Sequence, residues 1–167
     1  MGTLTHFDEN GKAVMVDVTD KKETQRTATA AGRITVNQEV YDAIEAGTIK
    51  KGDVLGVAAT AGIMGAKKTA ELIPMCHILP LSGCRIKFDK VPEERAIYAY
   101  CTVKCTGRTG VEMEALTGAA TALLTIYDMC KALDKTMKIG EISLLRKEGG
   151  KSGRIENEPV HNPPFEI

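Results

Sequence analysis

The chain has 167 residues, with 22 acidic and 22 basic side chains, so its formal net charge at pH 7 is zero. This balance argues against bulk electrostatic binding to nucleic acid or to an anionic membrane. With no Trp, three Phe and four Tyr, little aromatic surface is available for stacking bases, and the length favours one domain over residues 1–167.

Residues 23–36 alternate Thr, Ala, Arg and Ile, which predicts a strand with one wet face. Asn37 is a good N-cap for a short helix over 37–46, and Gly47 is its predicted C-cap. Asp53 can cap a longer helix that runs to about residue 73, before Pro74. The remaining predicted elements are strands at 84–90 and 96–106, a helix at 111–134 and a final strand at 137–146.

Merging the first two helices gives the order β-α-β-β-α-β, which is the ferredoxin-like plan. We therefore expect an α+β fold with an antiparallel sheet and helices packed on one face. Segments 1–22 and 147–167 are polar or rich in Gly and Pro, and we expect them to be mobile.

The predicted helix over 111–134 has an apolar body and charged ends. Glu112 and Glu114 stand at its start, and Asp128 and Lys131 stand near its end. Fourteen residues separate Glu114 from Asp128, which is about 21 Å along a helix axis. Either the two ends do different work, or one site is assembled from two subunits. The expected buried face comprises Val111 or Met113, Leu116, Ala120, Leu123, Tyr127 and Cys130.

Several charged residues allow both a functional and a structural interpretation. Asp128 and Lys131, three apart, can form an acid–base pair or an ordinary surface salt bridge. Lys51 precedes a helix N-terminus, where anions bind, but a solvated turn is the alternative. His77 lies among apolar residues and prolines, which suits a core histidine as well as a catalyst, and Arg26 can be a solvated edge residue.

The fragment GGKS at 149–152 is similar to part of a phosphate-binding P-loop. A P-loop needs a glycine where this chain has Leu145, and no helix is predicted after it. A Gly-rich loop remains, in which Lys147 and Lys151 could close over a phosphate or belong to a frayed end.

The cellular compartment is indicated by the cysteines and by the first residues. Five cysteines without zinc-type spacing favour free thiols in a reducing compartment. Cys101 and Cys105 on one strand would hold their thiols about 13 Å apart, too far to chelate one metal. The first residues lack a signal-peptide pattern, and the uncharged runs are too short to span a bilayer. We expect a cytoplasmic protein with no metal site.

Seven segments, in order along nearly the whole chain, together resemble the MoaC family of cyclic pyranopterin monophosphate synthases. The two most specific are TGRTGVEMEALT at 106–117 and LTIYDMCKA at 124–132. One departure is Ile78, where a proline often follows the loop histidine. The other five segments are LTHFDENGKAVMVDV at 4–18, KGDV at 51–54, AGI with AKKT at 61–69, LIPMCHILPL at 72–81 and GGKSG at 149–153.

This resemblance implies a reaction of molybdenum cofactor biosynthesis. The family rearranges (8S)-3′,8-cyclo-7,8-dihydroguanosine 5′-triphosphate to cyclic pyranopterin monophosphate and releases pyrophosphate. It implies no redox cofactor, although a divalent cation such as Mg²⁺ can accompany the triphosphate. It also implies a homohexamer built as a trimer of dimers, with the sites at the dimer interface.

The resemblance also assigns roles by motif. Asp128 is implied as general base or acid, Lys131 as the partner that tunes its pKa, and Lys51 as a contributor to catalysis. Glu112 or Glu114 would bind the edge of the guanine-derived ring. The implied triphosphate ligands are Arg26, Lys51, His77, Lys147 and Lys151, and the implied substrate-contact segments are Met75, Cys76 and His77 together with Met113 and Glu114.

Two alternative functions are compatible with the same predicted fold. A non-catalytic ferredoxin-like module that binds a phosphorylated purine or pterin ligand would keep the basic residues but would not need Asp128. An RNA-binding ferredoxin-like domain is disfavoured because the strands lack exposed aromatic residues for stacking.

Overall fold

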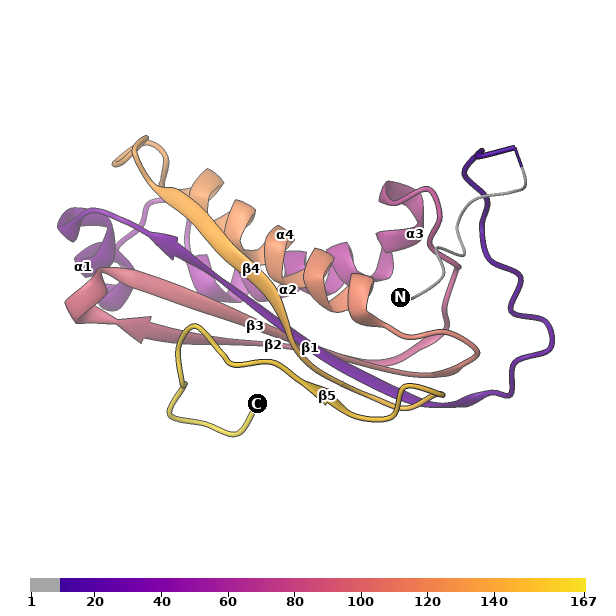
Figure 1. The fold of residues 1–167 in the computed structure, drawn as a ribbon. Helices are drawn as coiled ribbons and strands as arrows, with labels where there is room; N and C mark the ends of the chain where they lie inside the picture. The colour runs from indigo at the N-terminus through magenta and orange to yellow at the C-terminus, as the bar shows by residue number, and fades with distance from the viewer. Residues whose placement is uncertain (1–9) are drawn as a thin grey trace.

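The sheet is antiparallel and its strand order is β2-β3-β1-β4-β5 (Figure 1). The structure is a computed structural model, and it describes residues 10–167. The strands are β1 (Thr24–Thr35), β2 (Leu81–Val91), β3 (Ala96–Gly107), β4 (Lys138–Glu148) and β5 (Ile155–Glu156). The helices are α1 (Gln38–Ala46), α2 (Val54–Lys67), α3 (Thr69–Leu72) and α4 (Glu112–Cys130), with a 3₁₀ turn at Pro92–Glu94.

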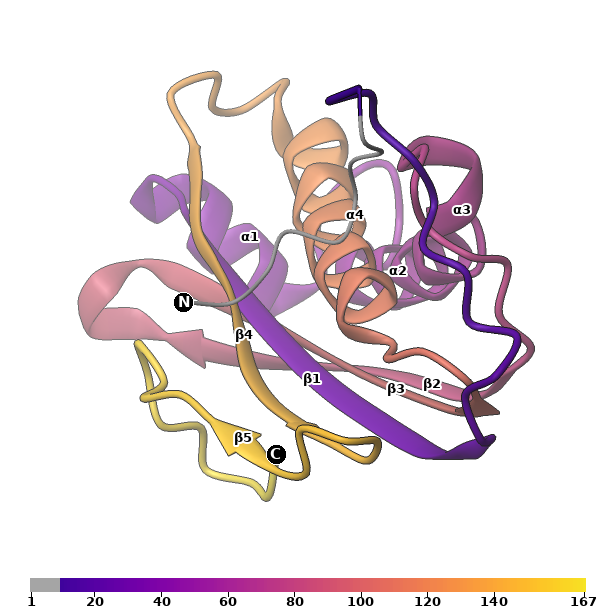
Figure 2. The same ribbon diagram turned by 45° about the vertical axis from the view of Figure 1, so that its right-hand side comes forward.

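The ferredoxin-like prediction is confirmed. β1 and β4 pair side by side, with Ile34 opposite Ile139, and β3 pairs with β1 on its other side. Helices α2 and α4 cover one face of this sheet (Figures 1 and 2). Buried side chains such as Ile34, Ile97, Leu123 and Ile126 fill the space between the two layers.

The predicted caps of the first helices are confirmed. The Asn37 side chain accepts a hydrogen bond from the Val40 amide at 2.9 Å, and Gly47 ends α1 with a left-handed φ of 66°. The Asp53 carboxylate accepts from the Gly56 amide at 3.0 Å and so begins α2. The Asn37 and Asp53 side chains each accept a hydrogen bond from an N–H group that has no partner within its own helix. Gly47 adopts the left-handed conformation that commonly ends a helix.

The single helix predicted over 53–73 is wrong in one respect, because it breaks at Lys68 into α2 and α3. The buried hydroxyl of Thr69 donates to the Ala66 carbonyl at 2.9 Å. Lys68, between the two helices, has φ −101° and ψ 9°, which lies outside the α-helical region. The short α3 then turns the chain toward residues 74–80 (Figure 2).

The face of α4 that packs on the sheet is rotated from the predicted one. Val111, Leu123 and Cys130 are buried as expected, but Leu116, Ala120 and Tyr127 are only half-buried and Met113 is exposed. Small residues such as Ala115 and Ala119 let the helix lie close to the sheet, whereas Met113 and Leu124 stand on its outer side. The rest of the buried face consists of Glu114, Ala115, Gly118, Ala119, Ala122, Ile126 and Met129.

The opposite face of the sheet is covered by the end of the chain (Figures 1 and 2). Phe165 packs edge-to-face on Tyr100 with ring centroids 5.4 Å apart, and His161 stacks on Tyr98 at 4.5 Å. The His161 ring also contacts the Asp89 carboxylate at 2.6 Å. Mobility of 147–167 and of 1–22 stays a prediction, and residues 1–9 lie outside the described residues, as does the start of the LTHFDENG motif.

Among residues 10–167, no helix combines the length and the apolar character that crossing a membrane requires. The five cysteines are all free thiols. Cys84 and Cys101 lie on neighbouring strands with their Sγ atoms 3.9 Å apart.

Candidate active site

A charged cluster lies at the C-terminal end of α4. The Lys131 ammonium donates to Asp128 Oδ1 at 2.7 Å, and the Lys51 ammonium lies 3.3 Å from Asp128 Oδ2. Lys51 also donates to the Asp128 backbone carbonyl at 2.7 Å, which holds the loop before α2 against the end of α4. Lys51 and Lys131, two of the residues predicted as catalytic, therefore lie within hydrogen-bonding distance of the carboxylate of the third, Asp128.

The hydrogen bonds within this cluster keep Asp128 negatively charged and Lys131 positively charged. Hydrogen bonds from Lys131 and then Lys51 lower the pKa of Asp128 below its usual value, so the carboxylate is ionised at neutral pH. The hydrogen bond to Asp128 in turn raises the pKa of Lys131, so its ammonium stays protonated. The Asp128 side chain is 59% exposed, which leaves room for a ligand beside it.

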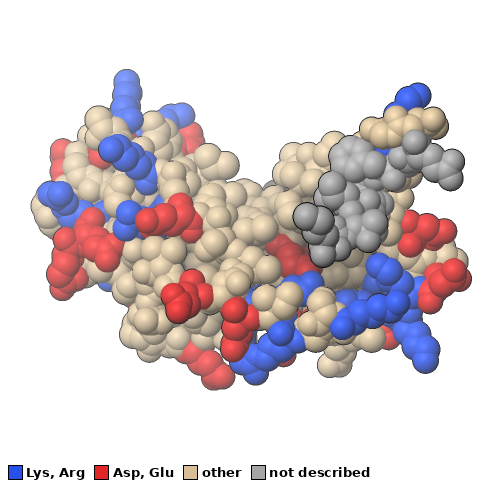
Figure 3. Space-filling model, viewed as in Figure 1, with Lys and Arg blue, Asp and Glu red and all other residues tan. Residues whose placement is uncertain are grey.

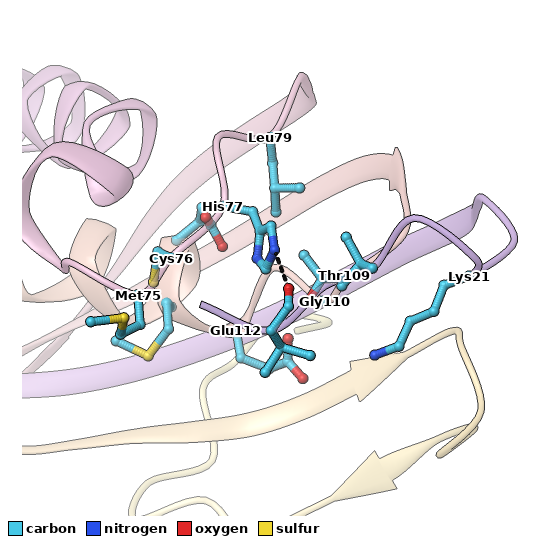
Figure 4. A pocket seen from close by; sticks show the side chains of 12 residues that line it. Lys21, Met75, Cys76, His77, Leu79, Thr109, Gly110 and Glu112 are labelled. Atoms are coloured by element: carbon cyan, nitrogen blue, oxygen red, sulfur yellow. Dashed lines mark hydrogen bonds between the residues drawn. The ribbon is translucent and has the colours of Figure 1, made fainter. Parts of the chain in front are cut away.

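A cavity of about 280 Å³ opens at the other end of α4 (Figure 4). Figure 4 shows Met75, Cys76 and His77 on one side of it and Glu112 with Gly110 on the other. These are the segments that the sequence predicted to contact substrate. The full lining is Val16, Val18, Lys21, Met75, Cys76, His77, Leu79, Thr109, Gly110, Glu112, Met113 and Glu114.

The two glutamates at the start of α4 differ in environment. Glu114 is only 4% exposed, and its burial raises the pKa of its carboxyl, to which the charge of Glu112 adds. Glu112 instead forms a partly buried ion pair with Lys147 from β4. One carboxylate is thus paired inside the chain, while the other is held in a poorly solvated position that suits a hydrogen-bonding ligand.

His77 is held by the N-terminal segment. Its Nε2 lies 2.8 Å from the Val16 carbonyl, the contact marked by the dashed line in Figure 4. A carbonyl only accepts, so Nε2 donates and Nδ1 is the nitrogen left for other contacts. Burial raises the pKa of the neighbouring Cys76 thiol, which therefore stays protonated.

A second and larger cavity, of about 680 Å³, adjoins the first and shares Lys21, Thr109, Gly110 and Glu112 with it. Its remaining lining is Asp20, Lys22, Thr24, Arg26, Arg108, Lys147, Gly150, Lys151 and Ser152. Six of these thirteen residues are Lys or Arg, so the cavity favours a polyanion.

Arg26 is positioned in this basic cavity by the chain around it. Its guanidinium donates to the carbonyls of Gly107 and Arg108 at 3.3 and 3.2 Å. Gly149 and Gly150 have φ of 102° and 73°, and a Cβ at Gly150 would lie 1.8 Å from Arg26 Nη1. The glycines thus let the loop lie directly against the guanidinium, beside Lys147 and Lys151.

The predicted site residues therefore fall into two groups. Met75, Cys76, His77, Glu112, Met113 and Glu114 line the first cavity, and Arg26, Lys147 and Lys151 line the adjoining basic one. Lys51, Asp128 and Lys131 line neither cavity and lie at the far end of α4, about 21 Å away along the helix axis.

The sequence interpretation missed the contribution of residues 16–22. Val16, Val18 and Lys21 line the first cavity, and Asp20, Lys21 and Lys22 line the second. Nothing in their spacing marks them, because they belong to no helix or strand. The MVDV part of the 4–18 motif was the one signal that pointed to them.

Within residues 10–167, no three His, Cys, Asp or Glu side chains are grouped so that they could hold a metal ion. In the larger cavity six Lys and Arg side chains outnumber Asp20 and Glu112, so its lining offers mainly donors to phosphate oxygens.

The chain is similar to known proteins over most of its length. The model of the MoaC family matches residues 15–150. A protein of Clostridium botulinum (strain Alaska E43 / Type E3), named cyclic pyranopterin monophosphate synthase, is 59% identical over 155 residues, which are 93% of this chain and 98% of the relative. Proteins of the same name from Trichlorobacter lovleyi and Geobacillus sp. (strain WCH70) are 58% and 55% identical, covering 93% and 95% of this chain and 97% and 94% of the relatives. The chain belongs to the MoaC family.

Proposed function

We propose that this chain is a cyclic pyranopterin monophosphate synthase, a lyase that acts in molybdenum cofactor biosynthesis. It would convert (8S)-3′,8-cyclo-7,8-dihydroguanosine 5′-triphosphate to cyclic pyranopterin monophosphate and pyrophosphate. The observation that carries this proposal is the convergence of Lys51 and Lys131 on the Asp128 carboxylate. A binding module has no need for an ionised base held between two ammonium groups.

The cyclisation step needs a proton acceptor and positive charge. A substrate hydroxyl attacks the phosphorus next to the ribose, an O–P bond forms, and the bond to the departing pyrophosphate breaks. The Asp128 carboxylate takes the hydroxyl proton, and the Lys51 and Lys131 ammonium groups offset the negative charge that develops at phosphorus. Opening and reclosing of the purine ring requires proton transfers of the same kind.

Substrate binding divides between the two adjoining cavities. The triphosphate lies in the cationic cavity with Arg26, Lys147 and Lys151, and a divalent cation such as Mg²⁺, where it accompanies the substrate, would be held by the phosphate oxygens. The guanine-derived ring enters the smaller cavity, where its N–H groups donate to Glu114 or Glu112 and its face meets Met75 and Met113. His77 contacts the substrate through Nδ1, because Nε2 is bonded to Val16.

The active protein is a homohexamer, a trimer of dimers, in the cytoplasm. The separation of Asp128 from Glu114 along α4 supports a site that two subunits complete together. In such a dimer each α4 serves two sites, one through each of its ends.

The decisive experiment is incubation of the purified protein with the cyclic dihydroguanosine triphosphate. We expect cyclic pyranopterin monophosphate, identified by mass spectrometry, and one pyrophosphate per product. If neither product forms while isothermal titration calorimetry shows tight binding of the substrate, the chain is a non-catalytic module for phosphorylated ligands. Tight binding to RNA, with a steep dependence on salt, would favour the RNA-binding alternative.

A further inference from the structure

A further cavity lies on the face of the sheet that has no helices, between the strands and the end of the chain. This sheet cavity has a volume of about 600 Å³, and none of its lining residues belongs to the two cavities of the candidate site. In Figure 3, Lys and Arg side chains, interspersed with Asp and Glu, line the lower edge of the molecule, where Figure 1 places β5. The charged residues of the sheet cavity are Arg85, Lys87, Lys104 and Arg146 against Glu148 and Glu166.

Strand pairing sets two of the cations and two hydroxyls in one row across the sheet. Arg85 of β2 is directly opposite Thr102 of β3. Thr102 is opposite Thr29 of β1, which in turn is opposite Arg146 of β4. Directly opposite residues project from the same side of a sheet. Lys104, two residues after Thr102, lies on that side as well, so β2, β3 and β4 each contribute a cation to one surface.

The sheet itself separates this cavity from the candidate site. Lys147 lines the basic cavity beside α4, whereas its neighbours Arg146 and Glu148 line the sheet cavity. Successive side chains of a strand point to opposite faces, so β4 supplies a cation to each of two cavities. The sheet cavity is therefore not an extension of the cavity in which we place the triphosphate of the substrate.

Three of the four cations in the sheet cavity are not used within the chain. Among residues 10–167, Arg85, Lys104 and Arg146 form no ion pair. Arg146 is half-buried, and its Nε is shielded from solvent without a hydrogen-bond partner in the part of the chain that the structure describes. A shielded donor without an acceptor is unfavourable, and a bound anion stabilises a guanidinium left in this state.

The two threonine hydroxyls add a neutral donor at the middle of the row. Thr29 is fully buried, and its Oγ1 lies 2.9 Å from Oγ1 of Thr102. Either hydroxyl can donate in this pair, and when Thr29 does so, the proton of the half-buried Thr102 is left for a ligand oxygen. The row thus offers guanidinium and hydroxyl donors side by side, which is the donor set that phosphate oxygens accept from.

We propose that the sheet cavity binds an oligophosphate anion, held by Arg85, Lys104 and Arg146. The strands β2 and β4 are three strand spacings apart in the sheet, about 14 Å, so a chain of two or three phosphates reaches both arginines better than a single phosphate does. The chemistry recognised is this phosphate chain, either free or as part of a nucleotide. The site does not rest on the proposed function, because none of its residues is assigned to catalysis or to substrate.

Calorimetric titration with inorganic triphosphate tests the site. The basic cavity beside α4 accepts the same probe, so we expect two binding events per chain for the wild type. Arg85→Gln/Lys104→Gln removes two exposed cations and should weaken one event about 10-fold or more while keeping the other. Lys90→Gln/Lys138→Gln, which removes two exposed cations at the other end of the sheet, is the control with the same loss of charge and should keep both events.

An isotherm of Arg85→Gln/Lys104→Gln equal to that of the wild type would overturn the proposal. If the basic cavity beside α4 binds no triphosphate, a single event that this variant weakens and the control keeps still supports the sheet cavity, so the two proposals fail separately.

Three further probes define the ligand. Pyrophosphate and ATP should both bind the sheet cavity, and Arg85→Gln/Lys104→Gln should weaken both. Equal affinities of pyrophosphate and ATP would show that the phosphates alone are recognised, whereas tighter binding of ATP would identify a nucleotide. Inorganic phosphate should bind at least about 10-fold more weakly than triphosphate, because one phosphate cannot span the row. Equal affinity of phosphate and triphosphate at this site would contradict an oligophosphate ligand.

Discussion

Asp128 accepts hydrogen bonds from two lysines that are far apart in the sequence, and this arrangement determines its charge. Lys131 lies one helical turn away, but Lys51 lies 77 residues away in the loop before α2. Both contacts hold the carboxylate in its ionised form, which is the form that a general base needs.

At the residue scale, Asp128→Asn should abolish most of the turnover without unfolding the chain. The amide keeps the size of the side chain but cannot take a proton, so kcat should fall about 100-fold or more. Because Asp128 is exposed, the melting temperature should stay close to that of the wild type. Pyrophosphate release and differential scanning calorimetry measure the two effects.

Glu71→Gln is a suitable control for this variant. Glu71 forms an i,i+3 pair with Lys68 on the surface, so the change removes a similar salt bridge outside the site. We expect wild-type turnover from Glu71→Gln. Full activity of Asp128→Asn would show that the catalytic role assigned to Asp128 is wrong.

Replacing Glu112 and Glu114 by Gln should change the melting temperature in opposite directions. Folding raises the pKa of Glu114, so the folded chain holds this proton more tightly and the carboxyl costs stability as the pH rises through its folded pKa. Glu114→Gln should therefore raise the melting temperature at pH 7, on the order of 2–4 °C for about 1 kcal/mol. The gain should shrink below the usual pKa of 4.5, where both states are protonated.

Glu112→Gln should instead lower the melting temperature at pH 7, because Lys147 loses the carboxylate with which it forms a partly buried pair. Calorimetry of both variants at pH 7 and near pH 4 gives the comparison. A lower melting temperature for Glu114→Gln at pH 7 would contradict the inferred cost of burying that carboxylate.

These contacts also show what a sequence can predict about single residues. The Asp128–Lys131 pair follows from a spacing of three on a helix, so local geometry was enough. The approach of Lys51 depends on how two elements pack, and only the family resemblance pointed to it. The pairing of Glu112 with Lys147 was not predicted at all, since it joins α4 to β4 across 35 residues.

At the scale of elements, small residues control how α4 is seated. Gly118 faces the sheet, and a Cβ added there would lie 2.5 Å from the Cys101 sulfur and 3.1 Å from the Gly62 carbonyl oxygen. Gly62 of α2 is equally close to the backbone of α4. The two helices and the sheet therefore meet at a point that has no room for a side chain.

Gly118→Ala should therefore destabilise the chain although alanine favours helix. The gain in helix propensity is about 1 kcal/mol, whereas overpacking costs about 1–3 kcal/mol, so we expect a net loss or no gain in the free energy of unfolding. Gly140→Ala is the control, because nothing lies within 4 Å of its added Cβ. Urea denaturation measures both variants, and a Gly118→Ala variant more stable than wild type by 1 kcal/mol would contradict the close packing.

The elements themselves were largely predictable, and the errors have a common cause. Caps such as Asn37 and Asp53 are local signals, and both were confirmed. The buried face of α4 was placed wrongly because apolar residues recur at intervals of three and four on more than one side of this helix. Ala115, Ala119 and Ala122 pack on the sheet, while Leu124 stands outside. The break at Lys68 was missed because no Gly or Pro stands at residues 67–69 to mark it.

At the scale of the whole molecule, the end of the chain closes the face of the sheet that has no helices. Phe165 contacts both the Tyr100 ring and the Lys87 ammonium, the latter 4.6 Å from the ring centroid. Lys87 also donates to the Glu166 carbonyl at 3.0 Å. A Pro-rich ending gives no periodic pattern, so the sequence could not show that it covers Tyr98 and Tyr100.

Phe165→Ala should reduce the free energy of unfolding by about 1–3 kcal/mol, through the lost apolar burial and the lost aromatic pair. Catalysis should not change, because the residue lies on the face of the sheet opposite α4. Val160→Ala, at an exposed position in the same segment, is the control and should be close to neutral. Equal stability of the two variants in urea would contradict the packing of the chain end.

The overall topology was predictable because the order of strands and helices along the chain admits few arrangements. The sequence predicted how far apart the two groups of site residues lie along α4, but it did not predict how they are brought together. A helix of known rise separates Glu114 from Asp128 whatever the packing around it, so one chain cannot bring them together. A site completed by a second chain would depend on an exposed surface, and the sequence interpretation had placed Ala120, together with Val111 or Met113, on the buried face.

The most direct test of the central claim is to mix Glu114→Gln, which we expect to lose the ring contact and with it turnover, and Asp128→Asn, which lacks the proton acceptor, after subunit exchange. In a mixed dimer one site carries both changes and the other carries neither. Equal mixing should therefore restore about a quarter of the wild-type turnover if pairing is random. Each variant alone should remain inactive. No recovery, with exchange confirmed by mass spectrometry of the mixed assembly, would contradict a site that two copies of this chain complete together.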